Sequence, residues 1–155
     1  MSRCVRLDVP LPADALFDYL SDPQRRPDWQ ASLRAVADVQ GAGELGTTWT
    51  DCTAVGARPR LRVTGYERPR VWIERGTWQG VAAVLRLDLL PYGVDRTRLT
   101  ATYAITGSGL FALPGAVLER LAGPAIAADL RRAVRLAAPT PGGSNLTWGS
   151  SRTQR

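Results

Sequence analysis

Apolar and polar residues alternate with a period of two through much of the chain between residues 3 and 106. The clearest run is the last one, where Leu99, Ala101, Tyr103 and Ile105 alternate with arginine and threonine. This alternation predicts antiparallel strands with one covered face and one wet face. We predict strands at residues 3–9, 33–39, 47–55, 60–66, 71–78, 83–89 and 98–106, separated by turns rich in glycine or proline.

Helical spacing of apolar residues occurs in two other places. Leu16, Tyr19 and Leu20 predict a short helix after the first strand, and Asp22 is placed to cap a second short helix that begins at Pro23. Residues 113–138 predict a long amphipathic helix, with a kink or brief break at Gly123-Pro124. Its apolar stripe consists of Leu118, Leu121, Ala122, Ile126, Leu130 and Val134.

These elements predict an α+β domain over residues 1–138, in which a curved antiparallel sheet of about seven strands surrounds the C-terminal helix. Two short helices follow strand 1, and an apolar pocket is expected between the sheet and the long helix. Residues 139–155 are rich in proline, glycine and serine and predict a disordered tail. Trp148 in this tail is expected to be an exposed side chain without a role, and the alternative is that it docks on a partner or the pocket mouth.

The composition restricts the chemistry available. The chain of 155 residues contains no histidine, and all 20 of its basic residues are arginine. This excludes catalytic triads and zinc sites that need histidine, as well as lysine Schiff bases. Cys4 and Cys52 have no metal-site spacing and are expected to be free, buried thiols. We expect no cofactor.

Charge and hydropathy address partners and location. The net charge is +6, but the arginines, including the pair Arg25-Arg26, are scattered and are expected on a solvated surface. We therefore expect no nucleic-acid partner. No apolar run approaches the length of an integral membrane segment, and the N-terminus lacks a signal-peptide pattern. These features favour a cytoplasmic protein, either a monomer or a homodimer.

The order of the predicted elements resembles the helix-grip fold of the START-related (SRPBCC) superfamily, particularly its polyketide cyclase/dehydrase-like bacterial families. Four segments carry the resemblance: the opening strand, helix and Asp-Pro at residues 9–23, Pro27-Asp28-Trp29, the corner at residues 63–70, and the start of the last strand at residues 95–100. The resemblance covers roughly residues 3–138. It implies a cavity for a small, largely apolar molecule, without implying one reaction.

Candidate pocket residues follow from the predicted faces. The apolar walls would be Leu85, Leu87, Tyr103 and Ile105 from the sheet, with Leu118, Ala122 and Ile126 from the helix. Tyr103 is the polar member of an apolar row, and a buried phenol usually needs a hydrogen-bond partner.

The strand at residues 71–78 leaves its facing open, because a slip of one residue exchanges its two faces. If Trp72 points inward, so does Glu74, whose buried carboxyl would act as a general acid or base. If Ile73 points inward, Arg75 would bind an anionic oxygen. The larger apolar area of the tryptophans favours the first arrangement.

Other candidate site residues are Trp49, Asp51 as a second acid, and Tyr19 at the pocket mouth. We predict a protein that binds a small lipid-like or polyketide-like molecule. The first alternative is a cyclase or dehydratase with Glu74 and Tyr103 as catalytic groups, which the absence of histidine disfavours. The second is a regulatory or toxin-like domain that binds a partner.

Overall fold

The structure is a computed structural model that describes residues 2–107 and 112–139, with side chains described for 2–107 and 122–139. Seven strands form one antiparallel sheet in the order β1-β7-β6-β5-β4-β3-β2. The strands are β1 (Arg3–Val9), β2 (Leu33–Gln40), β3 (Thr48–Thr53), β4 (Arg60–Glu67), β5 (Val71–Trp78), β6 (Val81–Pro91) and β7 (Thr97–Gly107). The predicted α+β fold with seven strands is thus confirmed.

Two short helices, α1 and α2, follow β1 as predicted, and a 3-10 turn joins them. Helix α1 spans Ala13–Ser21, a 3-10 turn η1 spans Pro23–Arg25, and α2 spans Arg26–Trp29. The side chain of Asp22 caps the 3-10 turn by accepting a hydrogen bond from the main-chain N–H of Gln24 at 2.9 Å.

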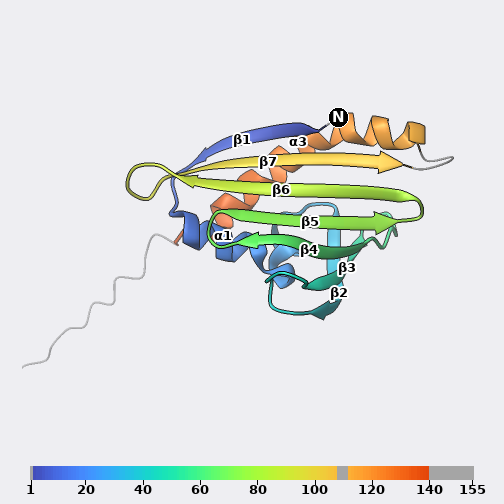
Figure 1. The fold of residues 1–155 in the computed structure, drawn as a ribbon, viewed down its shortest axis with the longest axis horizontal. Helices are drawn as coiled ribbons and strands as arrows, with labels where there is room; N and C mark the ends of the chain where they lie inside the picture. The colour runs from blue at the N-terminus through green and yellow to red at the C-terminus, as the bar shows by residue number, and fades with distance from the viewer. Residues whose placement is uncertain (1, 108–111, 140–155) are drawn as a thin grey trace, which may run out of the picture.

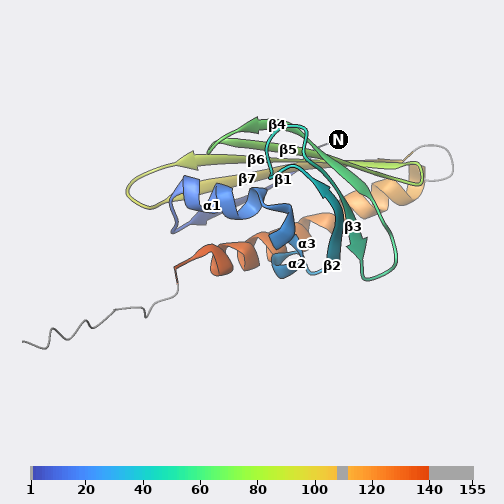
Figure 2. The same ribbon diagram turned by 90° about the horizontal axis from the view of Figure 1, so that it is seen from below.

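The long helix α3 spans Ala112–Ala137. It continues through Pro124, so a brief break there, one of the two outcomes expected, does not occur. Helix α3 packs against β7 and β1 and also contacts α1 and α2. All three helices lie on the same side of the sheet, which curves around them (Figures 1 and 2). We call the helix-covered side the inner face and the other side the outer face.

The hydrophobic core fills the space between the inner face and the helices. Its largest fully buried side chains include Phe17 and Leu16 of α1, Trp49 of β3, Leu99 of β7 and Leu130 of α3. The cross-strand register Leu87↔Ala101 and Leu89↔Leu99 keeps the apolar rows of β6 and β7 side by side on the inner face.

The outer face carries most of the polar residues that alternate with apolar residues along the strands. Cys4 of β1 lies there and is exposed, and Cys52 is half-buried, so the expectation of buried thiols is wrong. The cause at Cys4 is its strand position, because it alternates with inward Val5 and shares the outer face with Arg6. The predicted tail, including Trp148, lies outside the described residues except for residue 139.

Candidate functional site

A buried arginine from the short helix α2 is the central residue of the site. Arg26 is 3% exposed, although the sequence analysis placed it on the solvated surface. Its Nη1 donates to Oε2 of Glu74 at 2.7 Å, and its Nη2 donates to Oε1 at 3.0 Å. This bidentate pair joins α2 to β5 across 48 positions of sequence.

A second carboxylate completes what we call the buried charge cluster, which consists of Arg26, Asp51 and Glu74. Oδ2 of Asp51 lies 3.5 Å from Nη2 of Arg26. Two indoles fix the carboxylates: Trp49 donates to Oδ1 of Asp51 at 2.9 Å, and Trp72 donates to Oε2 of Glu74 at 3.1 Å. Each tryptophan precedes its acid by two residues, so both side chains project from the same face of one strand.

Aromatic rings enclose the guanidinium. Its carbon lies 5.0 Å from the ring centre of Trp49 and 5.7 Å from that of Trp29. Such contacts favour a cation because the faces of indole rings carry negative potential. The cluster is therefore an isolated group of charged side chains within the hydrophobic core, contributed by α2, β3 and β5.

The cluster contains two carboxylates and one guanidinium, all sealed from water. Burial raises the pKa of Asp51, an effect that Arg26 opposes and the charge of Glu74 reinforces. Glu74 takes both short contacts with the guanidinium, whereas Asp51 has one long contact. Two carboxylates face one guanidinium, so one negative charge has no full partner, and this charge belongs to Asp51. Protonation of Asp51 would remove it.

Three buried side-chain atoms have no hydrogen-bond partner among the described residues: Nε of Arg26, Nε1 of Trp29 and Oε1 of Gln30. All three belong to one segment of five residues that contains α2. An unpaired buried polar atom costs about 1–3 kcal/mol. The α2 segment is thus the least satisfied part of the described core.

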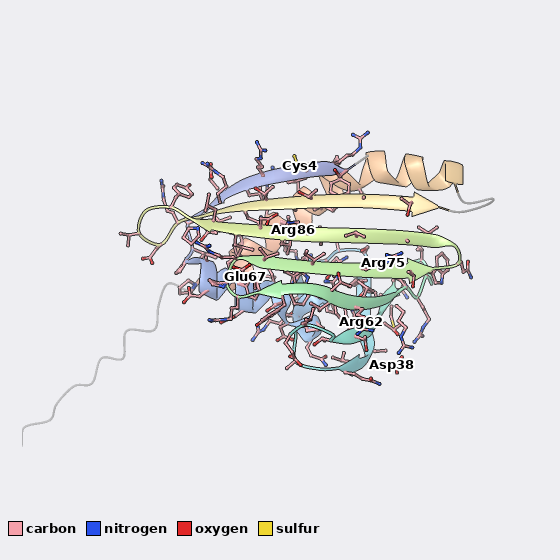
Figure 3. The ribbon with its side chains drawn as sticks, viewed as in Figure 1. Cys4, Asp38, Arg62, Glu67, Arg75 and Arg86 are labelled. Carbon is pink, nitrogen blue, oxygen red and sulfur yellow. The ribbon has the colours of Figure 1, made fainter. Side chains whose placement is uncertain are left out.

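Of the two possible facings of β5, the structure has the one in which Trp72 and Glu74 point into the core. Their exposed fractions are 2% and 4%, respectively. Arg75 is exposed on the outer face, where Figure 3 labels it. This is the facing that the apolar area of the tryptophans favoured. Burial of Arg26 was not predicted, because an arginine beside an exposed arginine gives no local sign of burial.

Most of the remaining candidate residues belong to β6, β7 and α3, and they differ in burial. Leu87 and Tyr103 are buried, whereas Leu85, Ile105, Ala122 and Ile126 are only half-buried. The hydroxyl of Tyr103 lies under α3 at Gly123, where an added Cβ would come within 2.7 Å of it. The side chain of Leu118 is outside those that the structure describes.

Tyr19 does not join the buried charge cluster. It is half-buried on α1, and the guanidinium carbon of Arg25 lies 5.3 Å from its ring centre. Burial raises the pKa of the Tyr19 phenol.

Two shallow hollows lie at the surface of the described structure. One, of about 490 Å³, is lined by residues 77–82 at the β5–β6 turn. The other, of about 340 Å³, lies at the opposite end of the sheet beside Pro12 and Gly93. The first adjoins the half-buried zone of the inner face.

Metal-ligating side chains do not gather in the described ranges 2–107 and 112–139, where no group of three or more His, Cys, Asp or Glu residues could hold an ion. In the same ranges, no helix has the length and apolar character needed to cross a membrane.

Comparison with known proteins addresses the family. A family model described as "Polyketide cyclase / dehydrase and lipid transport" matches residues 5–139. This chain belongs to that family. Comparison with curated proteins gives no match.

Solved structures show that this family member has the same fold as START-like proteins. A START superfamily protein from Mycobacterium smegmatis superposes with a TM-score of 0.74 at 15% identity, covering 88% of this chain and 99% of that one. A truncated norcoclaurine synthase from Thalictrum flavum gives 0.68 at 15% identity, with coverage of 90% and 94%. A conserved protein from Geobacillus kaustophilus gives 0.66 at 18% identity, with coverage of 88% and 95%.

Proposed function

We propose that this protein binds a small, largely apolar molecule between α3 and the half of the inner face nearest the β5–β6 turn. One observation supports this most directly. The inward row of β6 is buried at Leu87 and Leu89 but only half-buried at Leu85, Ala83 and Val81. Apolar side chains under a complete cover are usually buried, so this partly exposed row marks a stretch of the inner face that the helices do not fully cover.

The neighbouring strand and helix follow the same trend. On β7, Ala101 is fully buried, whereas Ile105, which pairs with Ala83, is half-buried. Ala122 and Ile126 of α3 are also half-buried. Apolar surface from three elements thus remains partly open in one zone, as in ligand sites lined by apolar side chains.

The buried charge cluster borders this zone, since Glu74 pairs with Leu85 across β5 and β6. Its three charged groups are satisfied mainly by one another and by indoles. We propose that the cluster fixes α2 and the inner end of the site, while Tyr103 supplies a polar contact nearer the ligand.

The enzyme alternative, with Glu74 and Tyr103 as acid–base groups, has weaker support. Glu74 is sealed from solvent and accepts three hydrogen bonds from Arg26 and Trp72. A group in that setting cannot reach a substrate without movement of α2.

Replacing either of two alanines by phenylalanine tests the proposed binding zone. Ala83→Phe would place a ring in the zone, whereas Ala104→Phe would place the same ring on the outer face, one strand away. We expect a fluorescent apolar probe such as 1-anilinonaphthalene-8-sulfonate to bind the wild-type protein and the Ala104→Phe variant equally, and the Ala83→Phe variant at least about tenfold more weakly.

Native mass spectrometry of the purified protein provides a second readout, because a co-purified apolar molecule would appear as a mass increment. Equal probe binding by both phenylalanine variants, with thermal denaturation showing that both are folded, would contradict the proposed site.

A further inference from the structure

Two exposed apolar side chains project from the same end of the sheet. Val55, in the β3–β4 turn, is 91% exposed, and Trp78, beside the β5–β6 turn, is 38% exposed. Both turns lie at one end because Arg60 at the start of β4 pairs with Thr77 near the end of β5. Figures 1 and 2 show the two turns at this end, which we call the open end.

Arginines without acidic partners lie next to these turns on the outer face. Arg62 of β4 stands directly opposite Arg75 of β5, and Arg60 is two residues away on the same face. All three are exposed, and none forms an ion pair with a described residue. Figure 3 shows Arg62 and Arg75 on neighbouring strands toward the open end.

This arrangement costs stability, because like charges directly opposite each other in a sheet repel. Two other arginines of the outer face are neutralised, since Arg86 pairs with Asp88 at 2.6 Å and Arg98 pairs with Asp8 at 3.0 Å. Exposed Arg6 of β1 forms no ion pair with a described residue, but Thr100 rather than another arginine stands opposite it. The repulsion between the directly opposed Arg62 and Arg75 is relieved when an external anionic surface covers them.

Exposed apolar side chains next to unpaired arginines indicate that this anionic surface is a lipid bilayer. Exposed indole and aliphatic groups on turns insert among lipid headgroups, and arginine side chains bind anionic headgroups while their methylene stems stay in apolar surroundings. We propose that the open end docks peripherally on a bilayer surface that contains anionic lipid, with Val55 and Trp78 inserted and Arg60, Arg62 and Arg75 on the headgroups.

The opposite end of the sheet offers an internal comparison. Val94 in the β6–β7 turn is 88% exposed, nearly as much as Val55. It is followed by Asp95, whose carboxylate an anionic surface repels, and then by exposed Arg96, while nearby Arg98 is already paired with Asp8. Exposed apolar side chains are therefore present at both ends, whereas among the described residues two arginines stand directly opposite each other only toward the open end.

The test is flotation of the full-length protein, without added ligand, with vesicles of phosphatidylglycerol and phosphatidylcholine or of phosphatidylcholine alone. We expect binding to the anionic vesicles and at least tenfold weaker binding to the neutral ones. Val55→Ser should weaken binding about fivefold, and the double variant Arg60→Gln/Arg75→Gln about 25-fold, since each arginine contributes about fivefold.

Matched controls separate docking from general effects of charge or hydrophobicity. Val94→Ser removes an equally exposed valine at the opposite end, and Arg131→Gln/Arg132→Gln removes the same charge from the exposed side of α3. Both controls should bind anionic vesicles within about twofold of the wild-type protein.

Failure to bind anionic vesicles, equal binding to neutral vesicles, or equal losses in the control variants would each overturn the docking proposal. Because no ligand is present, such a result would leave the proposed binding zone unaffected. Far-ultraviolet circular dichroism of each variant shows whether a loss reflects docking rather than unfolding.

Discussion

The two buried carboxylates of the charge cluster should respond in opposite ways to replacement by their amides. Asp51 has one contact with Arg26, at 3.5 Å, and its pKa is raised by burial. Asp51→Asn keeps an oxygen that accepts the hydrogen bond of Trp49 and removes the surplus charge. We expect this variant to gain stability on the order of 1 kcal/mol at pH 7.

Glu74→Gln has the opposite effect, because it removes the partner that takes both short hydrogen bonds of Arg26. Breaking a buried pair from one side usually costs about 3–5 kcal/mol. We expect a loss of about 3 kcal/mol at pH 7, since Asp51 would still balance the guanidinium charge.

The pH dependence of Asp51→Asn gives an independent check. A carboxyl whose folded-state pKa is raised binds its proton more tightly in the folded protein than in the unfolded chain. Its contribution to stability is complete below the ordinary pKa of 3.8 and is lost as the pH rises through the raised value. The advantage of Asp51→Asn should therefore be absent near pH 3.8 and grow toward neutral pH.

Urea denaturation followed by far-ultraviolet circular dichroism, at several pH values between 4 and 8, measures these differences. Asp95→Asn is the matched control, because Asp95 lies in an exposed turn with a φ of 52°, a conformation that asparagine tolerates. The reasoning would be refuted if Asp51→Asn destabilised the protein as much as Glu74→Gln, or if its effect did not change with pH.

Three further substitutions probe the packing around the site by the same denaturation assay. Gly123→Ala should cost about 1 kcal/mol in the wild-type protein, where the new Cβ meets the Tyr103 hydroxyl, but should stabilise the Tyr103→Phe background by up to about 1 kcal/mol. An equal effect in both backgrounds would rule out that contact. Thr97→Val should cost about 1–2 kcal/mol, because the buried hydroxyl donates at 2.7 Å to a main-chain carbonyl of the segment after β1. Leu130→Ala should cost about 2–5 kcal/mol, while Leu136→Ala, with its side chain 49% exposed, should cost under about 1 kcal/mol; similar losses would contradict the assigned face of α3.

The fold could be predicted from the sequence because its determinants are local and repeated. Alternation through residues 98–106 specified both the strand and its inward row, which the structure places at Leu99, Ala101 and Tyr103 of β7. Asp22 before Pro23 likewise predicted the cap of the short helical segment. Such patterns need only neighbouring residues to be recognised.

The break expected at Pro124 shows where a local rule fails. Proline removes one main-chain donor, but it does not by itself end a helix that is held by tertiary contacts. Helix α3 contacts β1 and β7, and these tertiary contacts favour a continuous helix over the local preference.

The site depended on contacts that no local pattern encodes. Alternation along residues 71–78 was enough to place Trp72 and Glu74 on one face of a strand, and the composition showed that no histidine is available for chemistry. The partner that makes burial of Glu74 tolerable is Arg26, 48 residues earlier, and it became evident only in the folded protein. The physical reason is that an arginine has the same sequence signature whether it faces water or a buried carboxylate, and the energy of that choice depends on groups that only folding brings together.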